Sequence, residues 1–149
     1  MAVINRLFKR DYEAVDTFDV GMVLNGPEVK SVRLGNIRLE SAFGKIINGE
    51  IYLINSEIPL YRFAKVENYE PARKRKLLLN KKEILKIFTK LNTGGRLTLI
   101  PVACYNKGRR IKLSLAVARG RGEIAKKKLE RLEDIKREEK KDMKEFMKS

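Results

Sequence analysis

Histidine and tryptophan are absent from this 149-residue chain, and cysteine occurs once, as Cys104. The absence of histidine excludes the Ser/His/Asp and Cys/His catalytic sets and removes the most common general base and metal ligand. A single cysteine excludes an intrachain disulfide, and because Cys104 lies in an apolar run we expect a buried, unreactive thiol. We therefore expect neither a metal nor a cofactor.

Long apolar segments are also missing. A membrane-spanning helix needs about 20 consecutive apolar residues, and no run in this sequence approaches that length. Residues 1–10 are interrupted by Arg6, Lys9 and Arg10 and lack the apolar core of a signal peptide. We therefore expect a cytoplasmic protein with no membrane partner.

Positive charge is what the chain has in excess. Lys and Arg number 34 against 19 Asp and Glu, which gives a formal net charge of +15. Self-repulsion among these cations opposes folding, so the excess indicates a polyanionic partner whose counterions are released on binding. A solvated, thermostable surface would carry Lys and Glu in closer balance, and we favour nucleic acid over that alternative.

Five apolar segments in the first 118 residues have the length and composition of strands. Asn48-Gly49 predicts a two-residue hairpin turn, and Asn106-Lys107-Gly108 predicts the basic tip of a second hairpin. The expected strands are residues 20–24, 37–43, 51–54, 97–105 and 110–118.

Two helices are predicted between these strands. Asn80 and Glu83 have the spacing of a capping box, and an apolar stripe follows until Gly94 and Gly95, which predicts a helix over residues 80–93. A shorter helix is predicted over residues 28–34, an arm or short helix over 1–11, and an irregular loop over 56–71. Short strands with flanking helices favour a mainly β fold, a small closed β-barrel of the oligonucleotide-binding (OB) type.

The composition changes at Arg119. Residues 1–118 hold 22 basic and 11 acidic side chains, whereas residues 119–149 hold 12 and 8 and few apolar ones. This tail is either a marginal helix that orders on a partner or an ordinary solvated helix. We expect an RNA-binding domain over 1–118 and a basic C-terminal tail, helical or disordered, over 119–149.

Four blocks of the sequence, together with Asn5, resemble the SmpB family, the SsrA-binding proteins of bacteria. Their order and spacing agree over nearly the whole chain. The blocks are Phe18-Asp19-Val20-Gly21, Gly26-Pro27-Glu28-Val29-Lys30-Ser31-Val32-Arg33, Pro71-Ala72-Arg73-Lys74-Arg75-Lys76-Leu77-Leu78-Leu79 and Ala118-Arg119-Gly120.

The resemblance implies an RNA-binding adaptor with no enzymatic activity and no cofactor. Such a protein binds the tRNA-like part of transfer-messenger RNA (SsrA RNA) and delivers it to stalled ribosomes for trans-translation. The resemblance assigns RNA binding to Asn5, Asp19, Leu78 and Lys112, with Asp19 standing where the family usually has Glu. Further RNA-binding candidates from the matched blocks and the basic run are Glu28, Lys30, Arg33, Arg73, Arg75 and Lys76.

The tail is expected to contact the decoding region of 16S rRNA on the ribosome. Ile124 and Ala125 depart from the family pattern, which has an aromatic residue or His followed by Asp at these positions. The expected contacts are Arg119, Arg121, Ile124, Lys126, Lys127, Lys128 and Arg131.

Two other functions stay open. A general RNA chaperone or ribosome-associated protein with the same fold would bind RNA without preferring the tRNA shape. A metal-dependent nuclease would use scattered carboxylates such as Asp11, Asp19 and Glu28, although single acids are more often solvated or ion-paired.

Overall fold

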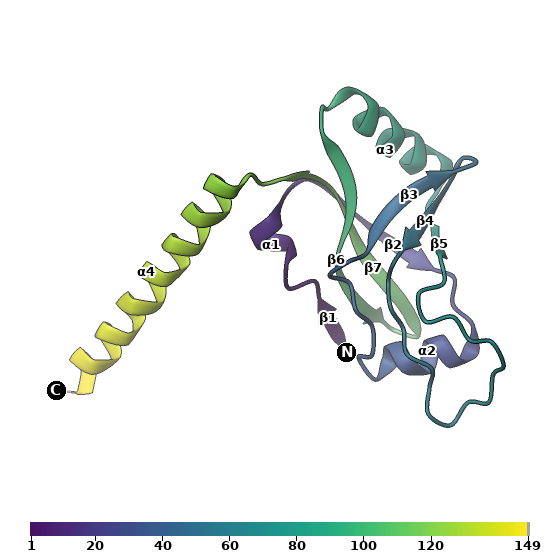
Figure 1. Ribbon diagram of the computed structural model, residues 1–149, viewed down its shortest axis with the longest axis horizontal. Coiled ribbons are helices and arrows are strands. Elements are labelled where there is room, and N and C mark those ends of the chain that lie inside the picture. The colour runs from purple at the N-terminus through teal and green to yellow at the C-terminus, as the bar shows by residue number, and fades with distance from the viewer. Residues whose placement is uncertain (149) are drawn as a thin grey trace.

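The computed structural model of the protein describes residues 1–148, and its main element is a sheet of seven antiparallel strands. The strand order is β1-β6-β3-β4-β5-β2-β7, and because β6 also pairs with β7, six strands close into a ring with β1 added beside β6 (Figure 1). This ring confirms the predicted mainly β, barrel-like fold. The strands are β1 (Ala2–Ile4), β2 (Tyr12–Met22), β3 (Phe43–Ile47), β4 (Glu50–Ile54), β5 (Arg75–Leu78), β6 (Leu97–Lys107) and β7 (Arg110–Gly120).

Helices flank the ring, as predicted. Figure 1 shows α2 and α3 at opposite ends of the ring and α4 extending away from it. Capping boxes begin both end helices: Asn25 bonds with Glu28 in α2, and Asn80 bonds with Glu83 in α3. None of the helices within residues 1–148 is long and apolar enough to cross a membrane. They are α1 (Phe8–Asp11), α2 (Gly26–Arg33), α3 (Lys81–Thr93) and α4 (Glu123–Lys148).

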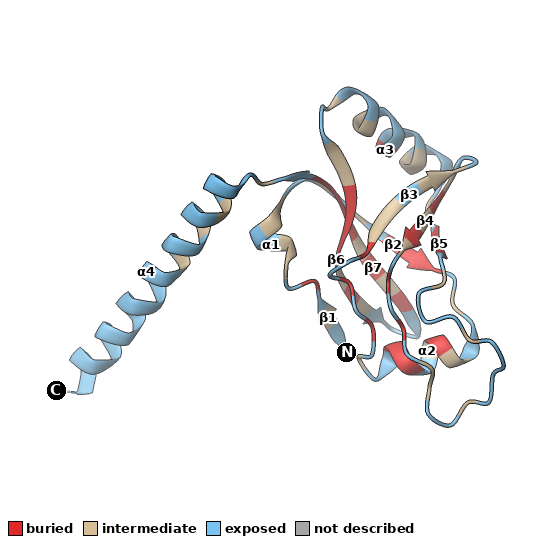
Figure 2. Ribbon diagram, in the orientation of Figure 1, coloured by how far each residue is buried: buried red, intermediate tan, exposed pale blue. Residues whose placement is uncertain are grey.

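The hydrophobic core fills the ring, where Figure 2 shows the buried positions. Alternate residues of each strand point inward, and Val32 of α2 and Ile87 of α3, both fully buried, join the same core. Cys104 is also fully buried, and burial raises the pKa of its thiol to about 12, which confirms the expected unreactive cysteine.

The strand predicted over residues 37–43 is wrong. Only Phe43 belongs to a strand, and the rest is a connection with one isolated bridge between Arg38 and Glu57. Ile37 and Leu39 are buried as the alternating pattern requires. The Leu39 carbonyl, however, accepts a hydrogen bond from the Asn5 side chain and not from a neighbouring strand.

Other boundaries differ because polar residues obscure the strand pattern. Residues 1–11 contain β1 as well as the short α1, and β2 begins at Tyr12 rather than residue 20. β5 begins inside the basic run Arg73–Lys76, which we expected only to precede a helix, and continues to Leu78. The second hairpin turns at Gly108 and Arg109, because β6 continues through Lys107.

The remaining predictions of local structure are confirmed. The helix over 80–93 matches α3, and the helix over 28–34 matches α2 apart from an earlier start. Asn48 and Gly49 have φ values of 51° and 76° and join β3 to β4, as a hairpin turn with two positive φ angles requires. Most of residues 56–71 is irregular.

Candidate nucleic-acid interface

A row of paired residues crosses four strands on the outer face of the ring. Leu78 of β5 pairs with Gly21 of β2, Gly21 pairs with Lys112 of β7, and Lys112 pairs with Tyr105 of β6. The adjacent residues Leu77, Leu113 and Cys104 are fully buried in the core. Because side chains alternate between the two faces of a strand, the row itself points outward.

Three members of this row, Leu78, Gly21 and Lys112, line a groove of about 600 Å³. α2 and the turn between β6 and β7 supply its other walls. Four lining residues are basic and none is acidic, so the groove has an apolar floor and a cationic rim suited to a sugar-phosphate chain. The complete lining is Gly21, Met22, Leu24, Val29, Arg33, Leu78, Arg109, Arg110, Ile111 and Lys112.

Gly21 leaves space at the floor of this groove because it has no side chain. A Cβ atom at this position would lie 3.2 Å from Leu78 Cδ1 and 3.3 Å from Leu78 Cβ. The missing side chain lets Leu78 lie across β2 while remaining 54 % exposed. The groove therefore presents an apolar side chain to solvent, where it can pack against a base or a sugar.

Arg33 connects the two sides of the groove. Its Nη2 donates a hydrogen bond of 3.2 Å to the carbonyl oxygen of Arg109, which joins the end of α2 to the β6–β7 turn. Arg33 and Arg109 both remain exposed. The Arg33 guanidinium is thus fixed at the backbone of the β6–β7 turn.

Asp19 lies on the same outer face, two residues before Gly21. It pairs with Ser114 and is exposed. Burial raises the pKa of the Tyr105 phenol, and a hydrogen bond with the Asp19 carboxylate raises it further. Asp19 is therefore a hydrogen-bond acceptor beside the cationic groove. A carboxylate in this position can accept a hydrogen bond from an amino group on the edge of a base.

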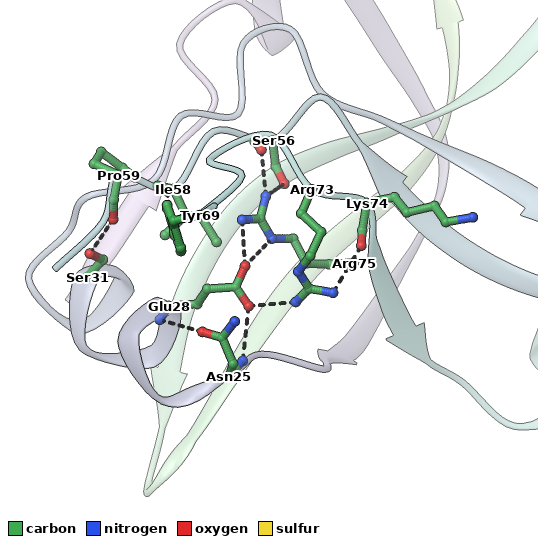
Figure 3. A network of polar contacts seen from close by, with 10 residues as sticks. All are labelled: Asn25, Glu28, Ser31, Ser56, Ile58, Pro59, Tyr69, Arg73, Lys74 and Arg75. Carbon is green, nitrogen blue, oxygen red and sulfur yellow. Dashed lines mark hydrogen bonds and ion pairs between the residues drawn. The ribbon is translucent and has the colours of Figure 1, made fainter. Parts of the chain in front are cut away.

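Glu28 of α2 and Arg75 of β5 form a buried ion pair (Figure 3). Glu28 Oε2 accepts hydrogen bonds from Arg75 Nε at 2.8 Å and Nη2 at 2.6 Å, and Oε1 accepts one from Arg73 Nη2 at 2.6 Å. Arg75 Nη1 donates to the Ser56 carbonyl at 2.7 Å. Burial raises the pKa of the Glu28 carboxyl, but the hydrogen bonds from Arg73, the Asn25 backbone and Arg75 outweigh it, so the pKa falls below its ordinary 4.5.

Direct RNA contact by Glu28 and Arg75 stays a prediction, and the structure places both side chains fully buried and bound to each other. Their pair instead fixes α2, which carries Arg33, against β5, which carries Leu78. A buried charge pair of this kind keeps its geometry only while both partners are present. We therefore assign both residues to positioning the groove walls.

Asn5 is likewise buried and lies outside the groove. Its Nδ2 donates to the carbonyls of Leu39 at 3.3 Å and Pro101 at 2.9 Å, and its Oδ1 accepts from the Leu7 backbone at 3.1 Å. These bonds attach the N-terminal arm to β6 and to the connection before β3. Asn5 thus positions the arm.

The remaining sequence candidates on the ring lie around the groove rather than in it. Lys30 on α2 is exposed, with its Nζ 5.4 Å from the centre of the Tyr61 ring. Arg73 is 40 % exposed although it binds Glu28, and Lys76 is 42 % exposed with its Nζ 3.7 Å from Glu50. These three residues add positive charge to the surroundings.

The tail begins at a polar junction with the N-terminal helix. Arg121 Nε donates to the carbonyls of Lys9 and Tyr12, and Lys126 Nζ lies 3.7 Å from the Asp11 carboxylate. No residue of α4 through Lys148 is buried. Arg119, Ile124, Lys127, Lys128 and Arg131 are all exposed, and Ile124 is 86 % exposed.

Sequence reasoning missed Arg109 and Arg110 as members of the site. Arg109 and Arg110 directly follow the predicted basic hairpin tip, so the doubled arginine was the available signal. Nothing in the sequence indicates that Gly21 and Leu78 pair, because β5 is not recognisable as a strand. Within residues 1–148 no group of His, Cys, Asp and Glu is arranged to hold a metal.

A larger groove of about 990 Å³ lies beside β1. Its charged lining residues are Arg6, Arg38, Glu40 and Glu57, so the cations and anions balance. A polyanion gains little from such a surface. The smaller groove with the uncompensated cations is therefore the better candidate.

Comparisons with known proteins give the family to which the chain belongs. The chain matches the SmpB protein family over residues 2–145. It is 41 % identical to the SsrA-binding protein of Protochlamydia amoebophila, covering 98 % of this chain and 92 % of that protein. It is 40 % identical to the SsrA-binding protein of Persephonella marina, covering 90 % of this chain and 88 % of that protein.

A solved chain described as "tmRNA-SmpB: a journey to the center of the bacterial ribosome" superimposes with a TM-score of 0.68 at 37 % identity, covering 82 % of this chain and 85 % of that one. Fold, sequence and structural similarity all lead to one conclusion: the chain belongs to the SmpB family.

Proposed function

We propose that this protein is an adaptor that binds the tRNA-like part of transfer-messenger RNA and delivers it to stalled ribosomes for trans-translation. The observation that carries the proposal is the groove, where Leu78 and Gly21 form an apolar floor beside Lys112 and the other basic lining residues. The SsrA-binding proteins among its relatives and the tmRNA–SmpB chain that it resembles support the same partners. The protein works without catalysis, in the cytoplasm, where ribosomes translate.

Each part of the groove has a separate role in this proposal. Lys112 and Arg33 neutralise phosphates and fix the position of the RNA backbone, and Leu78 packs against an unstacked base or sugar. Asp19 accepts a hydrogen bond from a base edge. Lys30, Arg73 and Lys76 contribute at longer range through the electrostatic potential.

The tail has a second role. We assign residues 1–118 to RNA binding and residues 119–149 to the ribosome, with the exposed tail side chains meeting the decoding region of 16S rRNA. A solvent-exposed helix with no buried residue is free to bury its surface on a partner. The contacts would be made by Arg119, Arg121, Ile124, Lys126, Lys127, Lys128 and Arg131.

A competition experiment tests the proposal. The affinity of the protein for the isolated tRNA-like part of transfer-messenger RNA is measured over a range of salt concentrations, beside a duplex RNA of equal length. We expect affinity for both RNAs to fall steeply with salt and the tRNA-like RNA to bind more tightly at every concentration. Equal affinity for the two RNAs would favour a general RNA chaperone, and cleavage of either RNA in magnesium would favour a nuclease.

A further inference from the structure

The loop between β4 and β5 carries an exposed aromatic ring outside the groove. Phe63 is 68 % exposed, and the Tyr61 ring lies edge-on to it with 5.5 Å between the ring centres. A single exposed apolar side chain is ordinary on a protein surface. The surroundings of Phe63, however, distinguish it from the other exposed apolar residues.

Cations accompany both rings. The Arg62 guanidinium lies 4.5 Å from the centre of Phe63, and the Lys30 ammonium lies 5.4 Å from the centre of Tyr61. Lys65 follows two residues after Phe63 and is exposed, whereas the acids Glu67 and Glu70 occur in the returning half of the loop. An aromatic ring interleaved with cations is the composition of a surface that binds single-stranded nucleic acid.

The base of the loop is fixed to the rest of the protein. The Tyr69 hydroxyl donates to the Ile58 carbonyl at 2.7 Å, and Ser31 Oγ on α2 donates to the Pro59 carbonyl at 2.6 Å (Figure 3). The Ile58 N–H donates to the Pro71 carbonyl at 2.9 Å, which closes the loop at its base. The ring is therefore presented from an anchored loop beside α2, so less ordering is required when a ligand binds.

We propose that Phe63 and Arg62 form a stacking site for one unpaired nucleobase of the bound RNA. The base would lie on the exposed ring, while Arg62, Lys65 and Lys30 attract the phosphates on either side. α2 links this site to the groove, because it carries Lys30 at the loop and Arg33 at the rim. The proposal rests on the proposed function, since both sites would hold the same RNA molecule.

A fluorescence experiment tests the stacking directly. The chain contains no tryptophan, so Phe63→Trp introduces a single reporter into the full-length protein. We expect its emission to be strongly quenched when the tRNA-like part of transfer-messenger RNA is added. The matched control is Leu85→Trp on α3, a position that is 64 % exposed and lies on the helix at the other end of the ring, and its emission should change little.

Affinity measurements with the same RNA provide a second readout. Phe63→Ala should weaken binding about tenfold, which is the range expected for one lost base stack, whereas Phe63→Tyr should bind like the parent. Val66→Ala, at a 44 % exposed position of the same loop, should have no effect.

The outcomes separate this inference from the proposed function. Unquenched Phe63→Trp and unweakened Phe63→Ala, in a protein that still prefers the tRNA-like RNA, would overturn the stacking site and leave the proposed function intact. The stacking site would also be overturned if Phe63→Ala bound the RNA like the parent protein and lost only binding to a ribosomal protein. A parent protein without preference for the tRNA-like RNA would instead overturn the proposed function.

Discussion

At the scale of single residues, Lys112 is the cation most directly placed for RNA binding. It lies in the cross-strand row and lines the groove between Gly21 and the exposed hairpin turn. The surrounding lining residues are apolar or basic, so no carboxylate in the groove competes for its ammonium group.

We expect Lys112→Ala to weaken binding of the tRNA-like RNA by about five- to tenfold. The slope of log affinity against log salt concentration should become shallower by about one, because one phosphate contact is lost. Anisotropy titrations at several salt concentrations measure both quantities. Lys45→Ala, which removes the same charge from an exposed position on β3, is the control. Equal losses for the two variants would mean that overall charge, rather than the groove, determines affinity.

Gly21 offers a test of shape rather than charge. In Gly21→Ala the new Cβ would crowd Leu78, and because Leu78 is half exposed it can move aside. We therefore expect a loss of unfolding free energy within about 1 kcal/mol and a clear loss of RNA affinity as the hollow fills. Chemical denaturation and RNA titration give the two numbers.

The second substitution in this test is Leu78→Ala. If crowding acts through Leu78, Gly21→Ala should have little further effect on affinity in the Leu78→Ala background. Additive losses would show that the two residues act independently.

At the scale of elements, the buried Glu28–Arg75 pair joins α2 to β5 and so joins two walls of the groove. Removing the carboxylate in Glu28→Ala leaves the Arg75 guanidinium buried without its partner. We expect the free energy of unfolding to fall by about 3–5 kcal/mol, measured by urea denaturation at neutral pH. Glu57→Ala, at an exposed acid, should cost far less.

Acid should have a related effect. The folded pKa of Glu28 lies below its ordinary 4.5, so the carboxylate stabilises the fold above that pH and the stabilisation is lost as pH falls through the folded value. Denaturation curves measured from pH 7 down to acid should show a smaller decline for Glu28→Gln than for the parent protein. An identical decline would place the acid sensitivity in other carboxylates.

The elements that sequence patterns predicted are those with local signals. α3 has a capping box and an apolar stripe, and the β3–β4 hairpin has Asn48-Gly49, so neither depends on distant residues. β5 and the first half of β2 were not predicted, because basic or exposed polar residues obscure their alternation and only partners far along the chain define them.

The candidate site also contains residues that the sequence identified and residues whose surroundings only the structure shows. Leu78 and Lys112 come from the family resemblance and the structure brings both into the groove. The burial of Glu28, Arg75 and Asn5 was not predictable, because charged and polar residues in the sequence give no sign that they will be buried. Burial depends on tertiary packing that composition does not encode.

At the scale of the whole molecule, the start of α4 and the residues just before it contact the N-terminal segment through a small polar junction. Arg121 bonds to backbone carbonyls of the N-terminal segment, and Lys9 of α1 pairs with Glu133 of α4 at 3.2 Å through side chains that are well exposed. Exposed pairs of this kind contribute little stability. The tail therefore adds little to the stability of the ring.

Truncation tests this division of labour. A chain that ends at Arg121 keeps all of β7 and the junction residue, and we expect it to unfold like the parent protein and to bind the tRNA-like RNA with similar affinity. Tagging of stalled translation products in a reconstituted system should be lost. Weakened RNA binding by the truncated chain would show that the tail belongs to the RNA site.

Ring closure also governs how the protein folds. The β3–β4 and β6–β7 hairpins join neighbouring segments, whereas β2 pairs with β7 in a register that runs from Tyr12 opposite Gly120 to Gly21 opposite Lys112. Joining such distant segments has a large loop-closure entropy, so the hairpins should form early and the β2–β7 seam late. Gly21 and Lys112 face each other across that seam, so we expect the groove to form late in folding, after Lys112 has been synthesised.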